Sequence, residues 1–102
     1  MAVYYLDSLV SKLKPTKRPW LPFMKGENVL TGLYIVRAGG QDTQQPHDTD
    51  EVYYVAEGKG KFVVGEKTVL VQAGSILFVK AEVEHRFFDI EEDLVLLVFF
   101  DQ

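Results

Sequence analysis

The chain has 102 residues, a formal net charge of −4 and no cysteine, which excludes disulfide bonds and thiolate metal ligands. This is the length of one domain, and a hydrophobic content of 47% indicates a globular rather than a disordered chain. No segment has the roughly 20 consecutive apolar residues of a membrane span, and none resembles a nucleic-acid-binding module. The N-terminus does not resemble a secretory signal, so we expect a cytoplasmic protein.

The N-terminal region predicts a short helix followed by an extended arm. One apolar helical face recurs at Leu6, Leu9, Val10 and Leu13. We expect a helix of about two turns there, ended by Pro15. Residues 15–28 contain three prolines and show no periodicity, which predicts an extended connector. Because this connector is rich in apolar residues, we expect it to lie across a sheet or against a second subunit.

The rest of the chain predicts an all-β structure. Short runs rich in β-branched and aromatic residues alternate with turn residues, which is typical of a β-sandwich or barrel. The expected strands are 29–37, 52–56, 61–64, 67–72, 75–79, 85–90 and 94–100. Gly65-Glu66 has the length and the leading glycine of a two-residue hairpin loop. The last run is apolar at every position and therefore predicts a strand that is buried on both sides.

The stretch from Gly39 to Gly60 contains one of the two histidines, His47, and an acid four residues later, Glu51. Side chains on a strand alternate between its faces, so Gln45, His47 and Glu51 would share one face. Imidazole and carboxylate groups suit a divalent transition metal, and two histidines with one carboxylate form the triad of non-haem iron oxygenases. The alternative is the end of a strand whose polar side chains are merely solvated.

This stretch resembles the first motif of the cupin family, G-x5-H-x-H-x3,4-E-x6-G. Gly39 opens the motif, Gln45 stands at its first histidine, His47 at its second, Glu51 at its acid and Gly58 at its closing glycine. Gln45 is thus the departure from the pattern, because a neutral carboxamide oxygen is a weaker ligand than imidazole.

The second cupin motif, G-x5-P-x-G-x2-H-x3-N, is matched more loosely. Gly74 opens it and His85 stands at its histidine. The other motif positions are replaced, by Lys80 for the proline, Glu82 for the glycine and Asp89 for the asparagine. In the family the proline and glycine shape the turn that delivers the histidine, so their loss bears on the geometry of this loop.

The resemblance implies a cupin double-stranded β-helix, or jelly-roll barrel, over residues 29–102. It would belong to a single cupin domain spanning 1–102, with the N-terminal helix and arm at 1–28. The resemblance also implies one divalent metal ion, either Fe, Mn, Ni or Zn, inside the barrel. The implied ligands are His47, Glu51, His85 and, if it completes the set, Gln45.

Cupins of this size resemble dioxygenases, isomerases and lyases that act on small organic molecules, so the resemblance implies a metalloenzyme of such a type. Candidate walls of a substrate pocket are Tyr53, Phe78, Phe87 and Trp20. Each of these aromatic residues could equally belong to an ordinary core. The alternatives are a non-catalytic small-ligand-binding or sensor cupin and a structural barrel with a degenerate site. We also expect a homodimer, because the apolar N-terminal arm has little core of its own to join.

Overall fold

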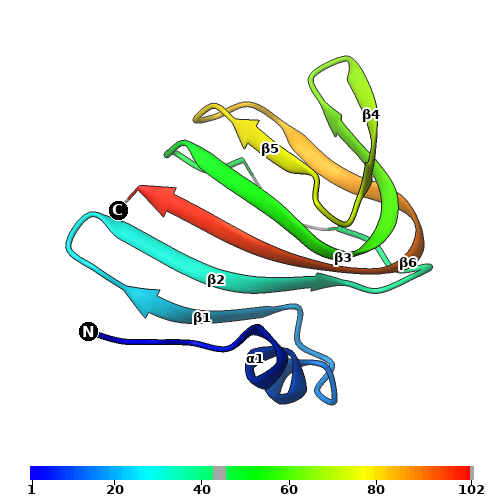
Figure 1. Ribbon diagram of the computed structural model, residues 1–102. Helices are drawn as coiled ribbons and strands as arrows, with labels where there is room; N and C mark the ends of the chain where they lie inside the picture. Colours follow the sequence, from blue (N-terminus) through cyan, green and yellow to red (C-terminus); the bar gives the residue numbers. More distant parts are fainter. Residues whose placement is uncertain (43–45, 102) are drawn as a thin grey trace.

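The computed structural model describes residues 1–42 and 46–101 and shows a strongly curved antiparallel sheet preceded by one helix (Figure 1). The elements are α1 (Leu6–Leu13), β1 (Trp20–Lys25), β2 (Val29–Val36), β3 (Glu51–Val64), β4 (Lys67–Gln72), β5 (Ile76–Val79) and β6 (His85–Asp101). The strand order is β1-β2-β6-β3-β4, and β5 pairs with the first part of β3. The predicted all-β fold with a short N-terminal helix is confirmed.

The predicted extended connector over residues 15–28 contains a strand that the sequence did not predict. Trp20–Lys25 forms β1, which pairs with β2 at the edge of the sheet. An edge strand tolerates Pro22 because the missing N–H need not complete a ladder. The register shifts between Pro22 and Met24. Pro22 thus distorts this strand without preventing it.

Two predicted strand breaks are instead bends within long strands. β3 runs through residues 58–60, and β6 runs through residues 91–93. The two strands pair along their length, with register shifts between Val55 and Lys61 that mark β-bulges. Gly58 lies at this bend with φ +100°, and a Cβ built on it would meet the carbonyl oxygen of Asp93 at 2.2 Å. The glycine allows the two backbones to touch, so the chain bends without ending the strand.

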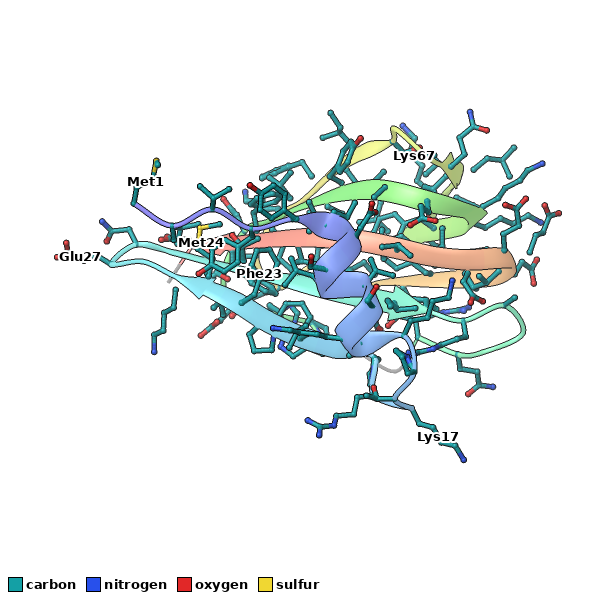
Figure 2. The ribbon with its side chains drawn as sticks, turned by 60° about the horizontal axis from the view of Figure 1, so that its bottom comes forward. Met1, Lys17, Phe23, Met24, Glu27 and Lys67 are labelled. Atoms are coloured by element: carbon teal, nitrogen blue, oxygen red, sulfur yellow. The ribbon has the colours of Figure 1, made fainter. Side chains whose placement is uncertain are left out.

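The predicted hairpin loop at Gly65-Glu66 is confirmed by the pairing of Val64 with Lys67. The helix is confirmed as well, and it lies across the outer face of the sheet (Figure 2). Leu9 and Leu13 of α1 pack there against Leu33, Ile35 and Val95. No helix in the described part of the chain is long and apolar enough to cross a membrane.

The main core fills the inside of the curved sheet. Leu94, Leu96 and Val98 of β6 point into it, whereas Val95 lies on the outer face beneath α1. The last strand is therefore buried on both sides here, as its apolar sequence predicts. The inner core surrounds the candidate site described next.

Candidate metal centre

His47, Glu51 and His85 meet at one point inside the barrel. One potential ligand atom of each residue lies within 4.8 Å of the others. Glu51 is the first residue of β3, His85 is the first residue of β6, and His47 lies in the loop before β3. The structure thus brings together three of the four residues predicted to bind a metal. The fourth, Gln45, lies outside the described residues.

The position of Glu51 follows from strand alternation. Glu51, Tyr53 and Val55 are buried, while Val52 and Tyr54 between them are exposed. The inner face of β3 therefore carries an acid, a tyrosine and a valine in sequence. Glu51 is the first residue of this face, and it is only 1% exposed.

The loop that precedes His85 is held against the loop that contains His47. The N–H of Glu82 donates to the carbonyl oxygen of His47 at 2.6 Å. The N–H of Ala81 donates to Oδ1 of Asp50 at 2.8 Å. Glu82 has a φ of +67°, so it adopts the left-handed conformation at the position where the cupin motif has glycine. The turn shape of the motif is kept although its glycine is not.

The neighbours of His85 determine which of its ring nitrogens carries the proton in the neutral ring. Its Nδ1 lies 2.8 Å from the carbonyl oxygen of Val83, which can only accept, so Nδ1 carries the proton and donates. In the neutral ring, Nε2 then presents its lone pair to the site. The Tyr53 hydroxyl donates to this nitrogen at 3.0 Å, and Oε1 of Glu51 lies 3.6 Å from it. Such a backbone hydrogen bond to the remote nitrogen is typical of a histidine that binds a metal.

The Glu51 carboxylate is only partly satisfied by the protein. Its Oε1 accepts a hydrogen bond from Nδ1 of His47. Its Oε2 is buried and has no hydrogen-bond partner among the residues that the structure describes. A buried polar atom without a partner costs roughly 1–3 kcal/mol. A cation bound between the carboxylate and the two imidazoles would remove this cost, so the donor set fits a divalent metal ion.

A pocket of about 670 Å³ opens beside His47. Its lining consists of Pro19, Trp20, Leu30, Tyr34, Tyr53, Val98 and Phe100, together with His47, Asp48, Thr49 and Asp101. The structure therefore places Trp20 and Tyr53 at the pocket, as expected of pocket walls. Most of these side chains are apolar, so the pocket suits a small organic molecule better than a strongly hydrated ion.

The two remaining candidates for the pocket wall lie elsewhere. Phe87 is buried in the core, where its ring centroid lies 4.5 Å from that of Phe62. Phe78 is 64% exposed and does not line the pocket. It pairs with Val52, which lies on the outer face of β3. Register across the sheet, which local sequence does not reveal, places this phenylalanine outside.

The indole of Trp20 packs against Gly32, a residue that the sequence analysis did not single out. A Cβ built on Gly32 would lie 2.2 Å from the Trp20 ring. The ring also makes edge contacts with Tyr34 and Phe100, at centroid distances of 6.4 and 5.8 Å. A glycine inside a strand is a known signal of close approach, so Gly32 could have indicated this packing.

A second polar pair in the barrel was also missed. The Tyr34 hydroxyl donates to Oδ1 of Asp42 at 2.5 Å, and Oδ2 of Asp42 accepts from the N–H of Phe87 at 2.8 Å. Burial, followed by this hydrogen bond and the negative charge of Asp42, raises the pKa of Tyr34 far above its ordinary value of 10.0. The hydroxyl is therefore protonated at neutral pH.

The curved antiparallel sheet and the His-Glu-His cluster inside it define a small barrel protein with a candidate metal centre. Residues 32–100 match the family described as the cupin domain. The chain therefore belongs to the cupin family, as the two sequence motifs suggest.

Known proteins resemble the chain over most of its length. An uncharacterized protein of Streptomyces coelicolor is 40% identical over 100 residues, which cover 98% of this chain and 95% of that protein. A crystal structure from Thermus thermophilus has a TM-score of 0.82 at 26% identity and covers 99% of this chain and 97% of its own. The DMSP lyase DddQ of Ruegeria pomeroyi has a TM-score of 0.72 at 14% identity, over 82% of this chain and 47% of that enzyme. This last likeness shows the fold alone.

Proposed function

We propose that the chain is a metalloenzyme that holds one divalent metal ion between His47, Glu51 and His85 and acts on a small organic molecule in the adjacent pocket. The observation that carries this proposal is the buried Glu51 carboxylate, whose Oε2 has no partner in the described part of the chain. Protein interiors rarely keep such an oxygen unless an ion or a reaction requires it. Two imidazoles beside it complete a donor set suited to Fe, Mn, Ni or Zn.

When bound, such a metal supplies Lewis-acid or redox chemistry to a substrate oxygen. The protein's own residues would prepare the site for it. The Val83 carbonyl fixes the tautomer of His85, so that Nε2 faces inward. The Tyr53 hydroxyl lies beside this nitrogen, within hydrogen-bonding distance. The rings of Trp20 and Phe100 line the pocket and offer apolar contacts to the carbon skeleton of a substrate.

The reaction type that we propose is that of a dioxygenase, isomerase or lyase. One structural relative, the DMSP lyase DddQ of Ruegeria pomeroyi, is a lyase built on this fold. Because this relative is only 14% identical, the likeness supports no more than the statement that such a barrel can contain a lyase site. A pocket that is mainly apolar with a few polar groups favours a small organic substrate over a polymer.

Metal content is the direct test. The wild-type chain, purified without a histidine tag, should carry about one equivalent of a transition metal by elemental analysis. Glu51→Gln should lose most of it, because the substitution removes the carboxylate while keeping its size. Glu57→Gln is the matched control, since Glu57 lies on the same strand but is exposed. Near-zero metal in wild type after reconstitution with each of the four metals would refute the proposal.

Turnover separates the enzyme from a binding module. The metal-loaded protein would be incubated with diketones, phenols and sugar acids while oxygen consumption and product formation are followed. Turnover that depends on the metal and is lost in Glu51→Gln supports the enzyme. Metal binding without turnover of any compound would favour the small-ligand-binding or sensor alternative.

A further inference from the structure

Tyr34 is a second tyrosine, besides Tyr53, in the lining of the pocket beside His47. It lies on the inner face of β2 and lines the same pocket as His47 and Tyr53. Most of its surroundings there are apolar, including the rings of Trp20 and Phe100. Its hydroxyl could fix the orientation of a ligand together with the other polar residues of the lining, which are His47, Asp48, Thr49, Tyr53 and Asp101.

The direction of this hydrogen bond is set by the protein. Asp42 accepts from the Phe87 N–H with one oxygen and from the Tyr34 hydroxyl with the other. A carboxylate is an acceptor at both oxygens, so the Tyr34 proton must point towards Asp42. The Tyr34 oxygen then has lone pairs but no proton for a ligand. Tyr34 can therefore act towards the pocket only as an acceptor.

We propose that Tyr34, locked by Asp42, is a specificity residue that selects small molecules with a hydroxyl or N–H donor remote from their metal-binding oxygen. This inference rests on the proposed function, which supplies the metal end of the site. It narrows the substrate class to compounds with a Lewis-basic oxygen at one end and a hydrogen-bond donor at the other, joined by an apolar skeleton. Compounds with an acceptor at the second position would place two oxygens face to face and be rejected.

One substitution can reverse the direction of the hydrogen bond between Tyr34 and residue 42. In Asp42→Asn, the Phe87 N–H still needs an acceptor, and the fixed backbone keeps the carboxamide oxygen on that side. The amide NH₂ then faces Tyr34 and donates to it. The Tyr34 proton is released and turns towards the pocket. The variant should therefore prefer ligands with an acceptor where wild type prefers a donor.

The single tryptophan of the chain reports binding, because Trp20 lines the pocket and its ring contacts that of Tyr34. The probes are benzoates with a hydroxyl, fluoro or formyl group at each ring position, whose carboxylate can reach the metal. Fluorine is close in size to the hydroxyl but donates no hydrogen bond. Affinities would be measured by fluorescence titration of the metal-loaded protein, with metal content determined on the same samples.

In wild type, at least one hydroxybenzoate should bind about 10-fold more tightly than the fluorobenzoate of the same ring position, as expected for one buried hydrogen bond. Tyr34→Phe should bring this ratio close to one. Asp42→Asn should bind the matching formylbenzoate more tightly than the fluorobenzoate. Tyr54→Phe, on the outer face of β3, is the matched control and should keep the wild-type ratio.

Three results would overturn the role of Tyr34. In the first, the metal-loaded wild type binds no hydroxybenzoate in preference to its fluoro analogue. In the second, the ratio of hydroxybenzoate to fluorobenzoate affinity is unchanged in Tyr34→Phe. In the third, Asp42→Asn remains folded but keeps the wild-type preference. Thermal unfolding of each variant checks that it is folded. A chain that holds no metal instead refutes the proposed function, so the two failures are distinguishable.

Discussion

Glu51→Gln should have opposite effects on stability with and without metal. In the metal-free protein, the carboxylate is buried with one oxygen that has no partner among the described residues. Its desolvation costs roughly 1–3 kcal/mol, and a neutral amide of the same size is cheaper to bury. We therefore expect Glu51→Gln to stabilise the metal-free chain by about 1 kcal/mol. For a domain of this length, that raises Tm by roughly 4–8 °C.

Bound metal should make wild type more stable than Glu51→Gln. A ligand that binds only the folded state at 100 times its Kd adds about 2.7 kcal/mol of stability. Wild type should gain this amount, which corresponds to a rise in Tm of roughly 10–20 °C. Glu51→Gln has lost an anionic ligand and should gain little. Wild type would then be the more stable protein in metal and the less stable one in chelator.

The assay is thermal unfolding followed by circular dichroism, in excess chelator and in excess metal, at about pH 8. Glu57→Gln removes one charge from an exposed position on the same strand and should follow wild type in both conditions. A metal-free Glu51→Gln that is less stable than wild type by more than about 1 kcal/mol would refute the reasoning. The carboxylate would then stabilise the fold through its contacts with the imidazoles.

Three further predictions concern packing. Gly58→Ala should lower the free energy of unfolding by about 3 kcal/mol or more, because the new Cβ would meet the Asp93 carbonyl oxygen at a left-handed φ. Chemical denaturation measures this loss, and a value below about 1 kcal/mol would contradict the prediction. Gly32→Ala should displace the Trp20 indole and shift its fluorescence to longer wavelength, and an unchanged spectrum would contradict the packing. We predict a homodimer that covers exposed Phe78, so light scattering should find Phe78→Lys monomeric; a monomeric wild type at micromolar concentration would argue against it.

Local sequence was sufficient for the parts of the fold governed by alternation and turn chemistry. Glu51, Tyr53 and Val55 lie on the buried face of β3, as their shared parity predicts. The hairpin loop at Gly65-Glu66 needed only its length and its leading glycine. His47 and Glu51 do meet, but the predicted reason, a shared strand face, was wrong, because His47 lies in the loop before β3. The arrival of His85 from a strand far along the chain required the family resemblance.

What local sequence did not predict depends on which strands lie side by side. The contact between Tyr34 and Asp42 joins β2 to the loop before β3. The carboxylate is held in turn by Phe87 of β6, whose neighbours become known only with the sheet order. Phe78 was misplaced for the same reason, because its pairing with Val52 puts it on the outer face. Strand β1 was missed because prolines argue against a strand unless its place at the edge is known.

The loose second motif could be taken as a sign that the site has decayed, yet the geometry of that loop argues against decay. Glu82 keeps the left-handed conformation of the motif glycine, which costs a residue with a side chain roughly 1–2 kcal/mol. Its N–H donates to the His47 carbonyl, and the neighbouring Ala81 N–H donates to Asp50. These two hydrogen bonds, each with a net value of about 1 kcal/mol, offset the strain. They also couple the loop that delivers His85 to the loop that carries His47, so the backbone preserves the meeting of the two histidines although the motif residues have changed.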